Sequence, residues 1–239
     1  MNATPADFPF HAIGFDLDGT LIDSFRDLGT AVNHALGEGG FEPVRVESSK
    51  DLIGGGAKIM LARAVEAQGG IEGGVEGDSF RALYKTMLGY YSKNNAVHTA
   101  PYPGAREVVG ELAARGVRMA VVTNKFSAFA TDILRQLDFA QPFETVIGGD
   151  TLGKGPDGNF LAKPHPRPVI EARTRLDADA SDRRFAFVGD SSYDVKAARG
   201  AEVPVIAAAY GYCDAPPEDL GADAVIASLD ELIPALERL

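Results

Sequence analysis

The sequence has 239 residues, and its 34 acidic and 23 basic side chains give a formal net charge of −11 at pH 7. Apolar residues make up 45% and charged residues 24%, which is typical of a folded globular protein and excludes a disordered or collagen-like chain. The acidic balance argues against binding to nucleic acid, because excess negative charge repels a phosphate backbone.

Cysteine content and the first residues narrow the class of protein further. Cys213 is the single cysteine, so an internal disulfide bond and a thiolate zinc site are excluded. No lysine or arginine precedes Arg26, and no long apolar run occurs there, so we expect no secretory signal or transit peptide. No segment approaches the roughly 18 apolar residues of a membrane span. We therefore expect a cytoplasmic protein with no membrane or nucleic-acid partner.

The first candidate strand, residues 11–15, is followed by a region with a different pattern. Residues 24–97 contain no convincing strand, and glycine-rich turns separate stretches of helical periodicity. The expected helices of this region lie near residues 25–36, 56–68 and 79–92. The segment PYPG at 101–104 suits a hinge. We therefore expect a small helical domain, 24–97, inserted into a domain formed by 1–23 and 98–239.

From the hinge onward, short apolar segments alternate with longer segments of helical periodicity. The candidate strands are 117–122, 144–149, 185–189, 203–209 and, more weakly, 223–227. The candidate helices are 105–115, 126–138, 166–176, 192–199 and 229–239, and residues 150–163 form a long loop or a short hairpin. This alternation predicts an α/β fold with a doubly wound (Rossmann-like) parallel sheet.

Two aspartates follow the first predicted strand in the segment FDLDGT. Asp16 and Asp18 can meet at the carboxyl end of the strand, where open α/β sheets bind their ligands, while Gly19 lets the backbone turn. A bound cation would relieve this crowding of negative charge, and oxygen ligands without histidine or cysteine favour Mg²⁺. The same pair is also compatible with an Asx-turn and a helix cap.

A second acidic pair occurs in FVGDSSYD, again at the end of a predicted strand. Asp190 would lie at the strand end and Asp194 one helical turn later on the same face. Both could complete a cation site with Asp16. Helix capping is the alternative, but it accounts for Asp190 or Ser191 and leaves Asp194 unexplained.

Two further segments, VVTNK at 121–125 and KPHP at 163–166, lie between the acidic pairs. Thr123 ends a predicted strand, and its hydroxyl with the free backbone N–H groups of the next helix could bind phosphate oxygens. Lys163 offers a positive charge. Each residue alone is also compatible with an ordinary surface position.

The ordered set of DLDGT, Thr123, Lys163 and GDSSYD resembles the four motifs of the haloacid dehalogenase superfamily of phosphotransferases. The resemblance spans the whole chain, because the helical insert matches the family's cap domain. It implies a fold in which the cap closes over the active site and residues 24–97 select the substrate.

The resemblance also implies catalytic roles. Asp16 resembles the nucleophile that attacks phosphorus and forms an aspartyl-phosphate, and Asp18 the general acid and base. Thr123, Asn124 and Lys163 would hold the phosphoryl oxygens. The acid at position 18 favours a phosphatase over a dehalogenase, because a halide leaving group needs no proton.

The implied cofactor is Mg²⁺. The carboxylates of Asp16 and Asp190 and the backbone carbonyl of Asp18 would bind it, with Asp194 as an outer or additional ligand. A local cation and Lys163 would explain how an acidic protein binds an anionic substrate.

The segments 51–67, GGDT at 148–151 and AKPHP most resemble phosphoglycolate phosphatases. The expected reaction is therefore hydrolysis of a small phosphorylated metabolite, with 2-phosphoglycolate as the leading candidate. Gly54–Gly56 could form a nest for the substrate carboxylate or only a tight turn.

Several alternatives stay open. A β-phosphoglucomutase-like sugar phosphomutase is less favoured, a phosphatase for another sugar or nucleotide phosphate is possible, and a non-catalytic binding protein is the third alternative. We expect a monomer or a homodimer.

Overall fold

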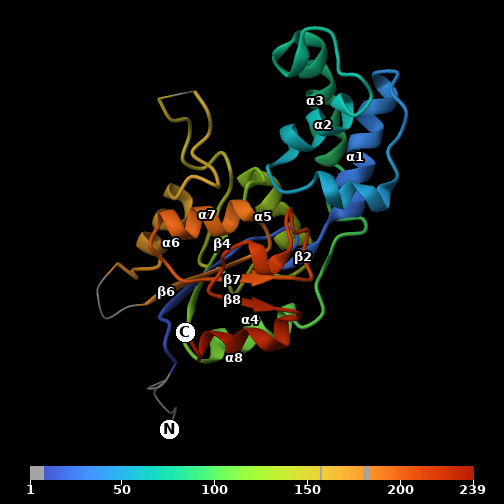
Figure 1. Ribbon diagram of the computed structural model, residues 1–239. Coiled ribbons are helices and arrows are strands. Elements are labelled where there is room, and N and C mark those ends of the chain that lie inside the picture. Colours follow the sequence, from blue (N-terminus) through green and yellow to red (C-terminus); the bar gives the residue numbers. More distant parts are fainter. Residues whose placement is uncertain (1–7, 157, 180–183) are drawn as a thin grey trace. The chain divides into compact units, whose positions relative to one another are not determined.

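The computed structural model describes residues 8–156, 158–179 and 184–239 (Figure 1). The described chain divides into two compact units. The sheet unit comprises the residues up to Asp23 and from Pro101 onward, and the helical unit comprises Ser24–Ala100. The second boundary thus lies at residue 100, whereas the sequence placed it at residue 97.

The sheet unit is built on a six-stranded parallel sheet in the order β5-β4-β1-β6-β7-β8. The strands are β1 (Ala12–Phe15), β4 (Arg118–Val122), β5 (Thr145–Ile147), β6 (Phe185–Gly189), β7 (Val205–Ala208) and β8 (Ala224–Ile226). Each strand lies inside a segment that the sequence predicts as a strand. The expected doubly wound fold is confirmed.

Strand β1 lies at the centre of the sheet, where the direction of winding reverses. Phe15 at its end is opposite Val121 of β4 on one side and Val188 of β6 on the other. The chain adds β4 and β5 on one side of β1 and then returns to add β6, β7 and β8 on the other. In such sheets the ligand crevice forms at the carboxyl ends of the strands beside this reversal, so these three strand ends are the expected place for a site.

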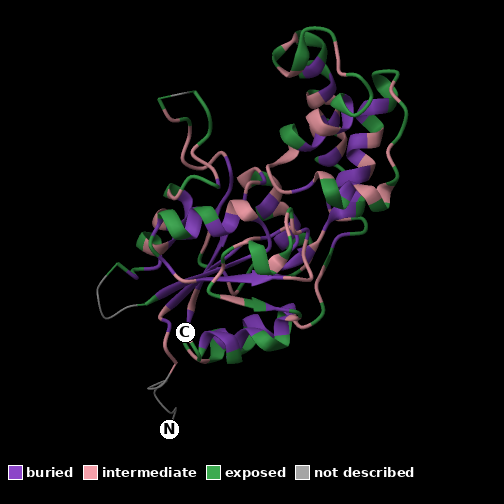
Figure 2. Ribbon diagram, viewed as in Figure 1, coloured by how far each residue is buried: buried purple, intermediate pink, exposed green. Residues whose placement is uncertain are grey.

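Helices cover both faces of the sheet. They are α4 (Ala105–Ala114), α5 (Ser127–Gln136), α6 (Arg167–Arg175), α7 (Ser192–Gly200) and α8 (Leu232–Leu236). Figure 1 shows α5, α6 and α7 on one face and α4 and α8 on the other. Because both faces are covered, β1 and β6 are buried at every position, as Figure 2 shows by the purple strands at the centre of the sheet unit.

The predicted helix at 229–239 is too long. Residues Leu229–Glu231 form a 3₁₀ turn, η4, and the α-helix begins only at Leu232. Pro234 is the reason, because proline has no N–H to donate to the carbonyl four residues earlier and is tolerated only in the first turn of an α-helix. A second short 3₁₀ turn, η3 (Pro217–Asp219), has no counterpart in the prediction.

Residues 150–163 form a short hairpin in their described part. Lys154 and Phe160 make an antiparallel bridge, and the Gly155 N–H donates to the Asn159 carbonyl at 2.8 Å. The Phe160 ring packs edge-on against Phe126, with 6.2 Å between ring centroids. Residue 157 lies outside the described residues.

The helical unit contains the three expected helices. They are α1 (Phe25–Glu38), α2 (Ala57–Glu66) and α3 (Asp78–Tyr91). The buried residues Leu28, Val32 and Leu36 form one face of α1, which packs against α2 and α3. Two 3₁₀ turns, η1 (Val46–Leu52) and η2 (Gly74–Glu76), were missed because their polar and glycine-rich sequences have no apolar periodicity.

Two-residue strands β2 (Ile22–Asp23) and β3 (Ala100–Pro101) pair with each other on the two connecting segments. Segments this short have no periodicity, so the sequence did not predict them. None of the helices in the described ranges is long and apolar enough to cross a membrane.

Candidate active site

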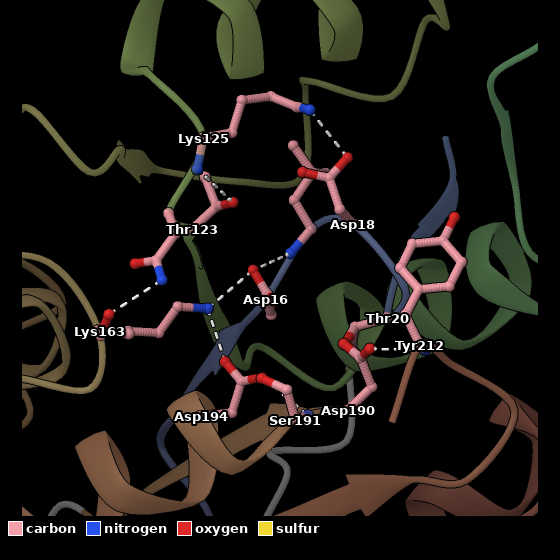
Figure 3. Close-up of polar contacts among 12 residues, drawn as sticks. Asp16, Asp18, Thr20, Thr123, Lys125, Lys163, Asp190, Ser191, Asp194 and Tyr212 are labelled. Atoms are coloured by element: carbon pink, nitrogen blue, oxygen red, sulfur yellow. Dashed lines mark hydrogen bonds and ion pairs between the residues drawn. The ribbon is translucent and has the colours of Figure 1, made fainter. Parts of the chain in front are cut away.

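The predicted site residues converge at the carboxyl edge of the sheet. Asp16 directly follows β1, Thr123 directly follows β4 and Asp190 directly follows β6. Lys163 comes from the segment before α6, and Asp194 lies in the first turn of α7. Figure 3 shows these side chains around one centre, although they come from segments far apart in the sequence.

Lys163 connects two of the acids. Its Nζ lies 2.8 Å from Oδ1 of Asp16 and 2.6 Å from Oδ1 of Asp194, and its side chain is only 2% exposed. The Asn124 side-chain amide donates to the backbone carbonyl of Lys163 at 2.9 Å, which fixes the segment that carries the lysine. The Asn124 amide therefore stabilises the segment that carries Lys163. The sequence analysis expected Asn124 to hold phosphoryl oxygens in the same region.

Asp16, Asp190 and Asp194 form a group that could hold a metal ion. One carboxylate oxygen from each residue lies within 4.8 Å of the others. Asp190 and Asp194 are buried, while the side chain of Asp16 retains 13% exposure. Such a set of hard oxygen donors fits a divalent cation of the Mg²⁺ type, and the cation would offset a concentration of negative charge that is otherwise costly to bury.

The Asp190 carboxylate is fixed from several sides. The Thr20 hydroxyl donates to Oδ1 at 2.8 Å, and the Tyr212 N–H donates to Oδ2 at 2.8 Å. Gly19 has a φ of +87°, and a Cβ there would collide with the Asp190 carboxylate. A Cβ at Gly211 would collide with Asp190 as well. These two glycines are therefore required by the close packing around Asp190.

Asp194 has two functions in the structure, and this corrects one sequence-based statement. It is the third residue of α7 in a capping box, where its Oδ2 accepts from the Ser191 N–H at 3.0 Å and from the Ser191 hydroxyl at 2.6 Å. Helix capping therefore does explain Asp194, contrary to the expectation. Its other oxygen, Oδ1, binds Lys163, so capping and participation in the site are compatible.

Asp18 forms an ion pair with a second lysine, Lys125. The Nζ of Lys125 lies 3.0 Å from Oδ1 of Asp18, and the two side chains are 5% and 12% exposed. The N–H of Lys125 also donates to the Thr123 hydroxyl at 3.2 Å. Lys125 lies in the VVTNK segment at 121–125, but the sequence pattern indicated no role for it.

The charges of the site shift the acidities of its groups. Burial raises the pKa of Asp16 to about 7, and the negative charges of Asp194 and Asp18 act in the same direction while Lys163 opposes them. Burial and the same kind of like-charge repulsion, from Asp194 and Asp16, hold the pKa of Asp190 well above its usual range. Burial alone would lower the pKa of Lys163, but the carboxylates of Asp16 and Asp194 raise it, so the lysine stays charged.

Sequence reasoning missed four contributors to the site besides Lys125. Thr20 stands inside the DLDGT segment, so its position beside the acids was a usable signal. Ser191 was considered only as a helix cap. Gly211 and Tyr212 act through close packing and a backbone N–H, and neither leaves a residue-type signal in a sequence.

Two charged residues of the helical unit are held by local contacts. Lys58 forms an ion pair with Glu76 at 2.6 Å, and the Arg63 guanidinium donates to the Leu52 carbonyl at 3.2 Å. Gly54 and Gly56 have φ values of +131° and +93°, so the turn before α2 requires glycine.

Comparison with known proteins gives the family. The family model described as haloacid dehalogenase-like hydrolase matches residues 13–208, which include every site residue from Asp16 to Asp194. The chain belongs to the haloacid dehalogenase-like hydrolase family.

Its similarity to individual family members extends over nearly the whole chain. It is 37% identical to the phosphoglycolate phosphatase of Rhodospirillum rubrum, over 90% of this chain and 86% of that protein. It is 35% identical to the phosphoglycolate phosphatase of Nitrosospira multiformis, over 96% and 97% of the two chains.

A crystal structure of a predicted phosphoglycolate phosphatase from Haemophilus somnus 129pt superposes with a TM-score of 0.82. Its sequence identity is 29%, and the alignment covers 94% of this chain and 97% of that one. The expected resemblance and the expected enzyme class, a phosphatase, are confirmed.

Proposed function

We propose that this phosphatase is an Mg²⁺-dependent enzyme that hydrolyses a small phosphomonoester, with 2-phosphoglycolate as the preferred substrate. The observation that carries the proposal is the position of Lys163 between Asp16 and Asp194, beside the third acid Asp190. The relatives named phosphoglycolate phosphatase support the choice of substrate.

In the first step, a carboxylate oxygen of Asp16 attacks phosphorus in line with the ester oxygen. The new bond joins that oxygen to phosphorus, and the bond to the substrate's alcohol oxygen breaks. Asp18 donates a proton to the departing oxygen, so glycolate leaves with a neutral hydroxyl group. The product on the enzyme is an aspartyl-phosphate at Asp16.

In the second step, Asp18 accepts a proton from a water molecule as that water attacks the same phosphorus atom. The bond between phosphorus and Asp16 breaks, and inorganic phosphate leaves. Asp18 is then protonated again and Asp16 is again a carboxylate, so the cycle balances in protons and in phosphate.

The phosphoryl oxygens need donors in both steps. The Lys163 ammonium, the Thr123 hydroxyl and the backbone N–H groups around Asn124 are positioned at the same sheet edge as Asp16. Because Lys163 is already desolvated, its charge can stabilise the charge that develops on these oxygens without further loss of hydration.

The carboxylates of Asp16 and Asp190 and the backbone carbonyl of Asp18 would hold Mg²⁺, with Asp194 as an outer or additional ligand. The bound ion would neutralise part of the negative charge of the acids and of the phosphoryl group. Thr20 and the Tyr212 N–H keep Asp190 oriented for this role.

Phosphate release from a panel of phosphomonoesters, measured with Mg²⁺ and with EDTA, tests the proposal. We expect metal-dependent turnover that is fastest with 2-phosphoglycolate and is abolished in Asp16→Asn with the fold intact. Turnover that is unaffected by EDTA, or that occurs equally in Asp16→Asn, would contradict it. A sugar phosphomutase would instead isomerise its sugar phosphate with little net phosphate release.

A further inference from the structure

Lys125 is a buried lysine whose backbone is held tightly in place. The residue is 9% exposed, and lysine is rarely this buried unless its charge is paired. Its N–H donates to the Thr123 hydroxyl at 3.2 Å, and its carbonyl accepts from the Gly149 N–H at 2.9 Å. A Cβ at Gly148 would lie only 2.8 Å from that carbonyl, so the segment after β5 packs closely against Lys125.

The side chain of Lys125 is directed at Asp18. Its Nζ lies 3.0 Å from Oδ1 of Asp18, and Figure 3 shows the Asp18 carboxylate turned toward Lys125 and away from Asp16. Asp16 is bound by a different lysine, Lys163. The two acids of the DLD segment, two residues apart, are thus oriented in different directions by two different cations.

We propose that Lys125 is a positioning residue that holds the Asp18 side chain in the orientation from which its protonated carboxyl group transfers a proton to the leaving oxygen. The inference rests on the proposed function, in which Asp18 is the general acid. A carboxylate on a short side chain has several rotamers, and catalysis by a positioned group depends strongly on its geometry. A cation on a fixed backbone selects one of those rotamers before the substrate arrives.

The leaving group of the substrate separates this role from a merely structural one. 2-Phosphoglycolate releases an alkoxide, which needs a proton to depart. Acetyl phosphate is of similar size but releases acetate, which needs none. For both substrates kcat/KM reports the steps up to formation of the aspartyl-phosphate, so the later action of Asp18 as a base does not enter the comparison.

We expect Lys125→Met to lower kcat/KM for 2-phosphoglycolate by about 10- to 100-fold and for acetyl phosphate by less than about threefold, since a positioned acid contributes roughly 10²- to 10⁴-fold. Asp18→Asn should show the same preference more strongly. In the Asp18→Asn background, Lys125→Met should cause no further loss with 2-phosphoglycolate, because both changes remove one function.

Equal losses with both substrates would overturn the inference, because they would mean that Lys125 binds the phosphoryl group or supports the fold. Unchanged activity with both, or additive losses in the double variant, would overturn it as well. Lys196→Met, a change at an exposed lysine of α7, is the matched control and should alter neither value.

Lys125→Gln provides a second variant of similar shape if the methionine variant does not fold, and we expect the same dependence on the leaving group. Circular dichroism and the acetyl phosphate activity report the folded state of each variant. A wild-type enzyme that releases no phosphate from either substrate would instead overturn the proposed function, so the two failures are distinguishable.

Discussion

The Nζ of Lys163 lies 2.6 Å from Oδ1 of Asp194, and the two side chains are 2% and 0% exposed. The ammonium and the carboxylate are therefore both removed from water and depend on each other for charge compensation. Removal of one partner of such a buried pair leaves an uncompensated charge, which typically costs about 3–5 kcal/mol.

We expect Lys163→Met to lower the free energy of unfolding by about 3 kcal/mol or more in EDTA at neutral pH. The double variant Lys163→Met with Asp194→Asn should be less destabilised than the single one, because it removes both charges while an asparagine oxygen can still accept from Ser191. Urea denaturation measures both values. Lys196→Met, at an exposed lysine of α7, is the control and should change the free energy of unfolding little. A change for Lys163→Met as small as that of the control would contradict the expectation.

The raised pKa of Asp16 predicts a pH dependence of stability in the absence of metal. Burial raises that pKa from 3.8 to about 7, so between these values the folded state binds a proton that the unfolded state has lost. The free energy of unfolding in EDTA should therefore fall as pH rises from about 4 to about 7. Asp190, whose pKa is also raised by burial, should contribute in the same direction.

Metal should reverse this trend, because a cation binds the deprotonated carboxylates. We expect the increase in melting temperature on adding Mg²⁺ to be larger at about pH 8 than at about pH 5.5, where bound protons compete with the metal. Thermal melts with EDTA and with MgCl₂ at both pH values measure it. Asp16→Asn should weaken the pH dependence, and an increase that is the same at both pH values would contradict the assignment.

The site residues that follow strands could be predicted because the ends of buried parallel strands can be recognised in the sequence. A buried parallel strand is a short apolar run, and the residue after it lies at the ligand-binding edge of the sheet. Asp16, Thr123 and Asp190 all follow such runs, so the pattern alone placed them together. Lys163 follows no strand. Its positive charge made it a candidate, and the resemblance to a known family gave it a role in the site.

The remaining contacts depend on packing that leaves no periodic pattern. The pairing of Lys125 with Asp18 joins residues from two different strand ends, and a lysine after a strand is most often a surface residue. Tyr212 contributes a backbone N–H, which every residue type except proline could supply. Asp27, an acid in the first turn of α1, has the pattern of an ordinary helix-dipole partner but is buried in the structure.

The close approach at Gly211 predicts that a single methyl group disturbs the proposed metal site. A Cβ at this position would collide with Asp190 and with the Gly19 carbonyl, so Gly211→Ala must displace the Asp190 carboxylate. A displacement of about 1 Å in a catalytic arrangement can cost roughly 100-fold in rate. We expect a loss of that order in phosphatase activity and a higher Mg²⁺ concentration for half-maximal activity.

The matched control for this variant is Gly110→Ala. Gly110 lies in α4 with open space around the place that a Cβ would occupy, so the alanine should preserve activity and raise helix stability by up to about 1 kcal/mol. Activity titrated against MgCl₂, with circular dichroism as a check on folding, compares the two. Wild-type metal dependence in Gly211→Ala would show that the packing around Asp190 can accommodate a methyl group.

Asp27 predicts a stability effect inside the helical unit. Its Oδ2 accepts from the N–H groups of His98 and Thr99, each at 2.9 Å, and from the Thr99 hydroxyl at 2.7 Å. These bonds attach the first turn of α1 to the last residues of the same unit, and the acid is only 3% exposed. Asp27→Ala would leave several donors without this acceptor, and each buried donor left unsatisfied costs about 1–3 kcal/mol.

We expect Asp27→Ala to lower the free energy of unfolding by about 3 kcal/mol, and Asp27→Asn to lower it less because the amide oxygen can still accept. Hydrogen exchange at the Thr99 amide should accelerate in Asp27→Ala more than in Asp27→Asn, since that amide donates directly to the carboxylate. Asp51→Ala, at an exposed acid of η1, serves as the control. If Asp27→Ala and Asp51→Ala have the same stability and the same exchange rate at Thr99, the carboxylate of Asp27 does not hold this segment.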